Sequence, residues 1–295
     1  MKGYKSTKPK VLIIGSDGLI GKKLYEYFEA KSYPVFGTTR RTKDKKIFLD
    51  LNKTESYENL FQMKYEFVFI CTGNSNISYC ENHPLETKIV NVKNTVCLVD
   101  ELSKRGSHII YISSSRVFDG NTYMPSIQNN LNPLTAYGRQ KVECESLIKS
   151  SSQSLTIVRL TEVIGHEYAI FDKWIKELRN NKNIYPFDNF YISPISLDFT
   201  IHNLSKLIEN RSQGVIQLSA LSDISYASSI SYIAEKLNLN KSKIMPRSLN
   251  NENNILLKKY ASLDTRFNNN SIDLPPKPEE ALAFYCKDKK NSSSL

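Results

Sequence analysis

Short apolar runs alternate with amphipathic stretches over the first 160 residues. The runs are apolar nearly throughout, which is typical of parallel strands buried on both faces, and they lie at residues 11–14, 35–38, 47–49, 67–71, 109–112 and 156–160. Between several of them apolar residues recur at helical spacing, at residues 19–30, 57–62, 84–104 and 135–149. This alternation predicts an α/β fold, a doubly wound parallel sheet with helices on both faces.

The alternation of apolar runs and amphipathic stretches changes after about residue 165. Helical patterns at residues 169–179, 197–208 and 227–237 surround one short apolar run at 215–218. The Asn-rich stretches at 250–254 and 268–270 are typical of loops, and the pair Pro275 and Pro276 interrupts regular structure. We expect one domain over residues 1–165, to which a segment near 191–218 returns, and a smaller mixed C-terminal lobe over 166–295.

Composition excludes several protein classes. The chain has 295 residues, 40% hydrophobic and 24% charged, as ordinary globular proteins do. No apolar run reaches the roughly 18 residues of a membrane span, so we expect a cytoplasmic protein without membrane partners. The 5 Cys form no C-x-x-C pair and the 4 His are scattered, so neither disulfides nor a metal site is expected.

The basic charge is concentrated near the start of the chain. The net charge is +10, and residues 1–50 hold 12 Lys and Arg against 5 Asp and Glu. A nucleic acid, a small ligand rich in phosphate, or merely a solvated basic tail at residues 2–10 would each fit this excess. Charge alone does not choose among them.

A glycine-rich turn follows the first apolar run. Gly15, Gly18 and Gly21 stand at G-x-x-G-x-x-G spacing, and Leu19 and Ile20 open the following helix. Glycines here allow a tight turn and the close approach of backbone N–H groups to a pyrophosphate, and the helix N-terminus favours the anion. The motif predicts a Rossmann-type dinucleotide-binding domain; an ordinary structural turn is the alternative.

The end of the second run indicates which dinucleotide. NAD-binding sheets usually carry an acid here to bond the ribose hydroxyls, whereas this chain has Arg40 and Arg41. Guanidinium groups pair well with a 2′-phosphate, so NADP(H) is favoured over NAD(H). The other interpretation is that both arginines only solvate a loop.

Further cofactor contacts are expected at the ends of the next strands. Asp50 and Leu51 follow the third run and could bracket the adenine, although Asp50 could equally form a turn. Residues Cys71, Thr72 and Gly73 end the fourth run and should line the same crevice.

A candidate acid–base pair lies at the start of a predicted helix. Tyr137 and Lys141 are four residues apart and so share one helix face. The pKa of a phenol is about 10, and a neighbouring ammonium stabilises the phenolate and lowers that pKa. Such pairs are common surface features, but here a serine cluster, residues 113–115, follows an apolar strand. One of its hydroxyls could bond a substrate carbonyl; capping or turn formation is the alternative.

These motifs together resemble the extended short-chain dehydrogenase/reductases, and within them the dTDP-4-dehydrorhamnose reductase group. The resemblance rests on residues 15–21, 111–120, 133–141, 158–165, 193–196, 214–220 and 263–265, nearly the whole chain. It implies reduction of a keto group on a nucleotide-linked deoxysugar for surface polysaccharide synthesis. It also implies a substrate-binding C-terminal lobe and a homodimer through the helices at 84–104 and 135–149.

The resemblance assigns roles to single residues. Ser114 takes the place of the catalytic Ser or Thr, where it would polarise the carbonyl. Tyr137 would protonate the alkoxide, and Lys141 would bond the nicotinamide ribose. Asn91 falls on a cofactor-contact position, as do Gly15, Gly18, Gly21, Arg40, Asp50, Leu51 and Thr72. The three catalytic groups are expected to meet beside the nicotinamide.

The chain also departs from the reductase pattern. Ser114-Ser115-Arg116 stands where the group usually has Thr-Asp-Tyr, and residues 161–165 read Thr-Glu-Val-Ile-Gly instead of Ser-Trp-Val-Tyr-Gly. Thr72-Gly73 replaces the usual alanines. A different sugar is therefore as consistent as rhamnose.

Three other functions are alternatives to the reductase. Dehydratases need an Asp-Glu pair where Ser115 and Arg116 stand, so dehydration is disfavoured. A 4-epimerase stays open, although Arg40 argues against its NAD. A non-catalytic NADP-binding regulatory subunit, like that of methionine adenosyltransferase, also stays open. None of these readings calls for a nucleic-acid partner.

Overall fold

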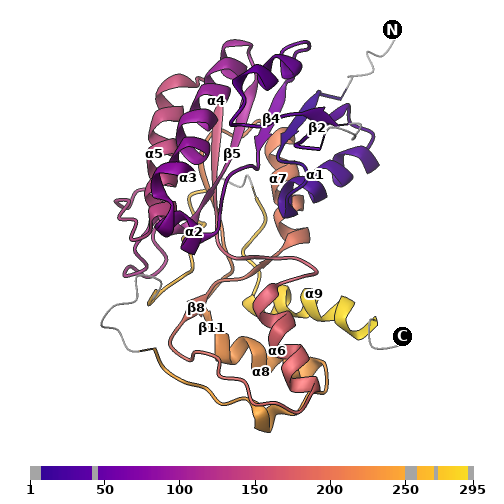
Figure 1. The fold of residues 1–295 in the computed structure, drawn as a ribbon, viewed down its shortest axis with the longest axis vertical. Helices are drawn as coiled ribbons and strands as arrows, with labels where there is room; N and C mark the ends of the chain where they lie inside the picture. Colours follow the sequence, from indigo (N-terminus) through magenta and orange to yellow (C-terminus); the bar gives the residue numbers. More distant parts are fainter. Residues whose placement is uncertain (1–7, 42–45, 250–257, 269–271, 292–295) are drawn as a thin grey trace. The chain divides into compact units, whose positions relative to one another are not determined.

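The computed structural model describes residues 8–41, 46–249, 258–268 and 272–291 (Figure 1). The chain forms two compact units. The first comprises Met1–Ser113, Ala136–Val158 and Ser205–Val215, and the second comprises Ser114–Thr135, Arg159–Leu204 and Ile216–Leu295. The division at residue 165 into a cofactor domain and a substrate lobe stays a prediction. Residues 2–7 of the basic tail and the Asn-rich stretch at 250–254 lie outside the described residues, as do 269 and 270.

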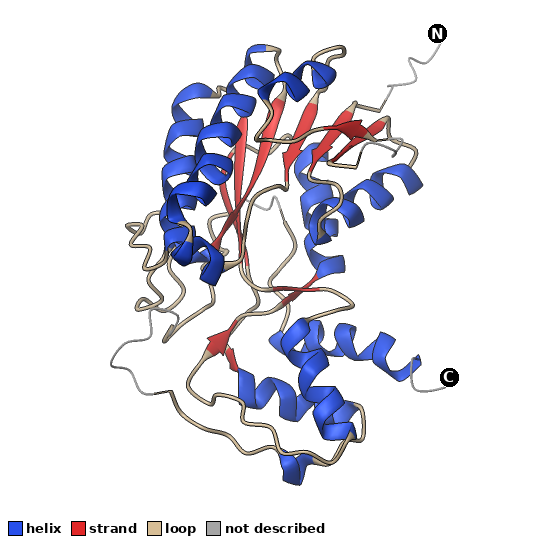
Figure 2. Cartoon of the chain, in the orientation of Figure 1, coloured by secondary structure: helices blue, strands red, loops and turns tan. Residues whose placement is uncertain are grey.

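A seven-stranded sheet forms the centre of the fold (Figure 2). Its order is β10-β6-β5-β4-β1-β2-β3, and β1 pairs in parallel with both β2 and β4. The strands are β1 Val11–Ile14, β2 Val35–Thr39, β3 Ile47–Phe48, β4 Phe67–Ile70, β5 His108–Ser114, β6 Leu155–Leu160 and β10 Gly214–Leu218. The predicted Rossmann-type fold is confirmed. Chain order reverses between β1 and β4, where such sheets open a crevice for a ligand.

Helices cover the sheet in the first unit, with α3, α4 and α5 on one face and α1 on the other (Figure 1). They are α1 Leu19–Ala30, α2 Ile77–Asn82, α3 Pro84–Lys88, α4 Thr95–Lys104 and α5 Ala136–Ser151. The helix predicted at 84–104 contains a π-helical segment, Ile89–Asn94, and the one predicted at 57–62 is a 3-10 helix, Thr54–Leu60. The short α2 was not predicted. The strands of the centre are apolar and fully buried, as their uninterrupted hydrophobic runs predicted.

The second unit is a mixture of helices and two small sheets. In chain order it holds the 3-10 turn Ser115–Val117, β7 Val163–Ile164, α6 Ala169–Arg179, β8 Tyr191–Ile192, β9 Ile195–Ser196, the start of α7 Leu197–Glu209, β11 Ile224–Ser225, α8 Tyr226–Lys236, the 3-10 turn Lys241–Lys243 and α9 Pro278–Asn291. β8 pairs with β11 antiparallel, and β7 with β9 in parallel. The helices α6, α8 and α9 share one apolar core. Within the described residues, no helix is long and apolar enough to cross a membrane.

The helix α9 was not predicted, although its start has an ordinary cause. Pro278 occupies the first helical turn, where its missing N–H costs nothing, and Glu279 and Glu280 favour the positive helix end. The Glu280 carboxylate accepts a hydrogen bond from the Lys277 N–H, 2.9 Å away, and so caps the helix. The proline pair just before it lies in irregular chain, as expected, and the helix begins at Pro278.

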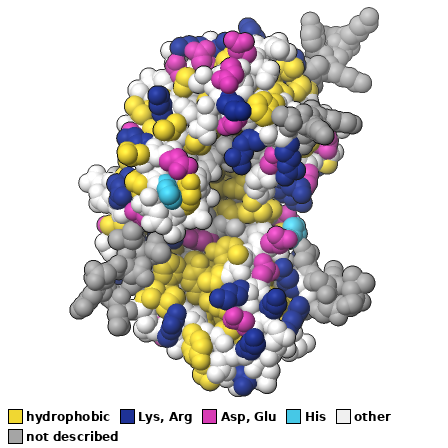
Figure 3. Space-filling view, in the orientation of Figure 1, with side chains coloured by type: hydrophobic (Ala, Val, Ile, Leu, Met, Phe, Trp, Pro, Cys, Tyr) yellow, Lys and Arg dark blue, Asp and Glu magenta, His cyan; other side chains and the backbone are white. Residues whose placement is uncertain are grey.

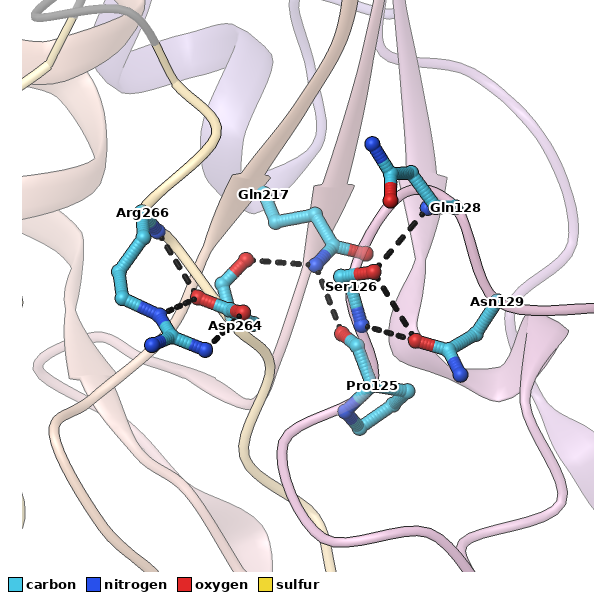
Figure 4. Close-up of polar contacts among 7 residues, drawn as sticks. All are labelled: Pro125, Ser126, Gln128, Asn129, Gln217, Asp264 and Arg266. Atoms are coloured by element: carbon cyan, nitrogen blue, oxygen red, sulfur yellow. Dashed lines mark hydrogen bonds and ion pairs between the residues drawn. The ribbon is translucent and has the colours of Figure 1, made fainter.

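Buried amide contacts join distant segments of the second unit (Figure 4). Gln217 Nε2 donates to the carbonyl oxygens of Pro125, at 2.9 Å, and of Asp264, at 2.8 Å. Arg266 then pairs with the Asp264 carboxylate. Ser219 Oγ accepts from the Leu263 N–H at 3.0 Å. The motif segments 214–220 and 263–265 therefore contact each other, and their hydrogen bonds stabilise this unit.

His108 is a buried histidine at the start of β5. Its ring nitrogens lie 2.7 Å from Ser154 Oγ and 2.8 Å from Thr156 Oγ1. Burial lowers the pKa of His108 to about 4, and the positive charge of Arg211 acts in the same direction. The folded state therefore holds this ring neutral at pH values where an unfolded chain would protonate it.

We predict that the free energy of unfolding falls as pH drops from about 6.5 to about 4, because only the unfolded state gains the proton of His108 over that range. Urea melts at several pH values measure this. His108→Gln removes this part of the slope, whereas His83→Gln, at an exposed position, leaves it unchanged. Identical slopes for His108→Gln and wild type would contradict the assignment.

Candidate functional site

Backbone packing requires glycine at two positions of the turn between β1 and α1. Gly15 has a φ of +87°, and a Cβ there would lie 3.0 Å from the Cys71 carbon and the Thr72 nitrogen. A Cβ on Gly21 would overlap the carbonyl oxygen of Gly15. At Gly18 the nearest atom would be 3.5 Å away, an ordinary contact. Gly15 and Gly21 thus let α1 begin close against the ends of β1 and β4.

The N-terminus of α1 is open to an anion. Gly18 is the N-cap residue, no side-chain hydrogen bond caps the helix, and no acid stands in its first turn. The first N–H groups of a helix lack partners within the helix and carry a partial positive charge. Leu19 is half-exposed and Ile20 partly buried at this end. The turn thus has the geometry that binds phosphate groups.

A cavity of about 580 Å³ opens at this turn, within the range of small-molecule sites. Eight of the predicted cofactor residues line it: Gly15, Gly18, Arg40, Asp50, Leu51, Cys71, Thr72 and Gly73. The predicted residues Leu19, Ile20, Gly21, Asn91, Tyr137 and Lys141 are not among its lining residues. The ends of β1, β2 and β4 and the residues after β3 thus lie around one cavity. Contact of these residues with a cofactor stays a prediction.

Sequence reasoning missed part of the cavity wall. The further lining residues are Ile14, Asp17, Thr38, Thr39, Leu49, Asn52, Asn74, Ser75, Asn76, Tyr79, Glu86, Thr87 and Val90. Several belong to α2 and the loop before it, which no hydrophobic periodicity marked. The polar run Asn74-Ser75-Asn76 directly after a buried strand was the available signal.

Asp17, in the glycine turn, is hydrogen-bonded to Thr39 at the end of β2. Thr39 Oγ1 donates to Asp17 Oδ2 at 2.6 Å, and Lys46 Nζ lies 3.1 Å from Asp17 Oδ1. The Thr39 hydrogen bond, with help from Lys46, lowers the pKa of Asp17 against the effect of burial. Arg40 is exposed and lines the cavity, whereas Arg41 is exposed and does not. Lys46 therefore offsets the negative charge of Asp17.

Two predicted cofactor residues have local structural partners. Asp50 Oδ1 accepts from the Asn52 N–H at 3.0 Å, which is the turn-forming contact weighed from the sequence. Asn91 Oδ1 accepts from the Asn74 N–H at 2.7 Å, and its Nδ2 donates to Gln140 Oε1 at 2.7 Å. Asn91 therefore holds the loop after β4 against α5.

Cys71 lies at the cavity but offers no nucleophile. Burial raises the pKa of its thiol to about 12, and the nearby charge of Lys141 only partly opposes this. Because the thiolate is the reactive form, the Cys71 side chain is chemically inert at neutral pH.

Lys141 is a buried ammonium at the end of β5. It is 6% exposed, and its Nζ donates to the Ile112 carbonyl oxygen at 2.8 Å and to Tyr111 Oη at 3.1 Å. The same nitrogen lies 5.8 Å from the centre of the Tyr137 ring. The helix α5 thus presents both side chains on one face, as the spacing of four predicted, and it sets a fixed positive charge beside a phenol.

Ser114 lies in the second unit. Its Oγ accepts a hydrogen bond from the Arg116 N–H at 3.2 Å and so caps the short 3-10 turn, which was the structural alternative for this cluster. The side chain is partly exposed. Its neighbour Ser113 is buried and donates to the Glu145 carboxylate. The meeting of Ser114 with Tyr137 and Lys141 stays a prediction.

Comparison with known families identifies the family to which the chain belongs. The family model described as the RmlD substrate binding domain matches residues 9–288. The chain belongs to the RmlD family. This result confirms the expected resemblance to the extended reductases.

Individual relatives of this RmlD-family chain differ in function. Methionine adenosyltransferase 2 subunit beta of Bos taurus is 29% identical over 161 residues, 53% of this chain and 47% of that protein. The match thus spans about half the length of that relative. The spore coat polysaccharide biosynthesis protein SpsK of Bacillus subtilis is 24% identical over 175 residues, 59% and 60% of the two chains.

A solved structure confirms the fold over nearly the whole chain. The dTDP-4-dehydrorhamnose reductase of Bacillus anthracis, in complex with NADP, superimposes with a TM-score of 0.85 at 19% identity. The match covers 96% of this chain and 99% of that one. At this identity the likeness shows that the RmlD-family chain shares the reductase fold.

The glycine turn yields a prediction about stability. Gly21→Ala should lower the free energy of unfolding by about 1–3 kcal/mol, the usual cost of overpacking, because its Cβ would overlap Gly15. Gly18→Ala, where there is room, should cost less than about 1 kcal/mol. Chemical denaturation without ligand compares the two. Equal losses would show that the close packing at residue 21 has no energetic weight.

Proposed function

We propose that the chain reduces a keto group on a nucleotide-linked sugar with NADP(H). The observation that carries this proposal is the buried Lys141 ammonium beside the Tyr137 ring. It lies in the same compact unit as the glycine turn and its cavity. Family membership supports the reaction class, since the solved relative is a sugar-nucleotide reductase.

The residues of the first unit fit a dinucleotide. Gly15 and Gly21 let the turn pack closely against the backbone around it, and the start of α1 has no side-chain cap on its N–H groups. The pyrophosphate would bind there. When bound, the reduced nicotinamide supplies a hydride for the keto carbon of the substrate.

The chain's own groups then manage the proton. Tyr137 donates its phenolic proton to the alkoxide oxygen, and the Lys141 ammonium stabilises the phenolate that remains. Ser114 donates a hydrogen bond to the substrate carbonyl oxygen and so favours the developing negative charge. Ile112 and Tyr111 fix Lys141 by accepting its hydrogen bonds, which keeps its charge in place through the cycle.

Arg40 supports NADP(H) as the preferred cofactor. It lines the cavity at the end of β2, where no acid follows the strand, and a guanidinium can pair with the 2′-phosphate in a bidentate manner. The nearby carboxylate of Asp17 is already engaged by Thr39 and Lys46. It therefore does not replace the ribose-binding acid of NAD sites.

A regulatory subunit is the second candidate function. The identity to part of methionine adenosyltransferase 2 subunit beta is compatible with it but does not favour it over the reductase. The retained Ser114, Tyr137 and Lys141 speak for an enzyme instead. NADPH oxidation with dTDP-, UDP- and GDP-linked 4-keto sugars separates the two, since a regulatory subunit binds NADPH but turns over none of them.

Tyr137→Phe removes the proposed proton donor and nothing else. We expect kcat to fall by a factor of about 100 or more, as for the loss of a general acid, with the Kd for NADPH within about twofold of wild type. Absorbance at the NADPH band and a fluorescence titration measure the two quantities. Tyr123→Phe, at an exposed position, is the matched control. Turnover of Tyr137→Phe at the wild-type rate would refute the role.

Arg40→Ala tests the cofactor preference. The Kd for NADPH should rise about tenfold or more, because a charge-assisted contact to phosphate is lost, while the Kd for NADH changes little. Arg41→Ala is the matched control, since Arg41 is exposed but does not line the cavity. Equal weakening of both cofactors by Arg40→Ala would remove the phosphate argument.

A further inference from the structure

Lys258 is a buried amine without an ion-pair partner among the described residues. The residue is 5% exposed, and its one hydrogen bond in the described part of the chain runs from Nζ to Ser115 Oγ at 3.4 Å. Burying a charge costs much free energy unless the charge is paired. An ammonium held this way therefore calls for a functional explanation.

The stem of Lys258 is held in place by a glycine. A Cβ on Gly120 would lie 2.8 Å from both Cβ and Cγ of Lys258, so only glycine allows the two segments to pack this closely. Gly120 also has a φ of +79°, and its carbonyl oxygen accepts from the Tyr260 N–H at 2.9 Å. These contacts fix where the ammonium ends, next to Ser115.

Two carboxylates oppose the positive charges around Lys258, but neither forms an ion pair with it among the described residues. Burial, together with the positive charge of Arg116, lowers the pKa of Lys258 to about 7, although the carboxylates of Glu162 and Asp223 oppose the shift. Asp223 accepts from two backbone N–H groups, and Glu162 lies 3.7 Å from Arg116, beyond hydrogen-bond distance. Burial raises the pKa of Tyr168 and of Tyr226; the charge of Glu162 adds to this rise, and the charge of Arg116 opposes it.

We propose that Lys258 and Arg116 form a binding site for an oxyanion of the substrate, a carboxylate or a phosphate. The site adjoins the candidate catalytic hydroxyl, because Ser115 and Arg116 directly follow Ser114 and the Arg116 N–H bonds its Oγ. It rests on the proposed function, since the substrate in question is the nucleotide-linked keto sugar. It also deepens that function by naming a charged group that the substrate carries.

An anion fits this pair of cations better than uncharged hydroxyls do. A neutral sugar would leave Lys258 without an ion-pair partner among the described residues, whereas an oxyanion pairs with its ammonium form and offsets that form's loss of hydration. Arg116 adds a planar donor fork that matches a carboxylate or a phosphate. In the usual reductase pattern Tyr stands at position 116 and Trp at position 162, so this charged set replaces aromatic side chains.

Calorimetric titration of the whole protein with four probes tests the site: UDP-glucuronic acid, UDP-glucose, UDP and free glucuronate. We expect Lys258→Met to weaken oxyanion binding about tenfold or more, and Arg116→Gln to weaken it as well. Lys258→Arg should keep most of the affinity, because it keeps the charge. Lys259→Met, at the exposed neighbouring position, is the matched control.

The probes distinguish the two sources of the oxyanion. If the sugar carboxylate occupies the site, UDP-glucuronic acid binds more tightly than UDP-glucose, and Lys258→Met removes the difference. If the diphosphate occupies it, UDP alone loses affinity in Lys258→Met. Lys258→Met should fold, because replacing a buried unpaired charge by an apolar chain is neutral or stabilising; thermal melts check this.

Proton uptake gives a second readout. At pH 8 the free Lys258 is mostly neutral, and an anion favours its charged form, so binding should take up a fraction of one proton. Titration in two buffers of different ionisation enthalpy measures this uptake, which Lys258→Met should abolish. Arg116, Glu162, Asp223, Tyr168 and Tyr226 remain in that variant, so the difference belongs to Lys258.

Either of two results overturns the proposal: wild type binds none of the four probes, or Lys258→Met binds them all as wild type does. These outcomes are separable from failure of the reductase proposal. Oxyanion binding that depends on Lys258, without NADPH oxidation on any keto sugar, keeps the site and rejects the reaction. Turnover that is insensitive to Lys258→Met and Arg116→Gln keeps the reaction and rejects the site.

Discussion

The close approach of backbone at Gly15 and Gly21 is the constraint on which the first unit depends. Any side chain at residue 21 would overlap the Gly15 carbonyl oxygen, and one at residue 15 would press on the chain after β4. The start of α1 therefore lies directly over the point where strand order reverses, with its N–H groups uncapped. The cavity and its phosphate-binding character follow from that packing. On the face drawn in Figure 3, the described Lys and Arg side chains lie among Asp and Glu.

Two buried lysines show how burial can serve different ends. Lys141 has a carbonyl and a hydroxyl as acceptors within 3.1 Å, so its position is fixed by the fold itself. Among the described residues, Lys258 donates one hydrogen bond, to Ser115 Oγ at 3.4 Å, and the charges of Arg116, Glu162 and Asp223 act on it. The first arrangement suits a charge that must stay constant beside Tyr137. The second suits a charge that gains its partner from a ligand.

Much of the first unit could be predicted from the sequence because its signals are local. Short, continuous apolar runs such as residues 11–14 and 67–70 are typical of parallel strands buried on both faces. The glycine spacing indicates the turn that follows the first of them. The elements that were missed lack such signals. α2 has only six residues, and α9 follows a proline pair that indicated a break. The π-helical segment at Ile89–Asn94 is invisible to periodicity, because its neighbours continue the helix on both sides.

The candidate site was predictable only in part, for a related reason. Residues such as Gly15 and Arg40 directly follow a predicted strand, so their place at the edge of the sheet could be predicted from the local sequence. Asn91 could not be assigned that way, since its partners Asn74 and Gln140 lie far along the chain. Lys258 gave no signal either, because its burial depends on Gly120, more than 100 residues earlier. Contacts of this kind exist only in the folded chain.

Transfer of deuterium from NADPH labelled at C4 of its nicotinamide tests the central claim most directly. After incubation with a nucleotide-linked 4-keto sugar that the protein turns over, mass spectrometry and NMR of the sugar locate the label. The account predicts deuterium at the former carbonyl carbon, from one face of the nicotinamide only. Bound NADPH that delivers no deuterium to any keto sugar of the dTDP, UDP and GDP series would contradict it.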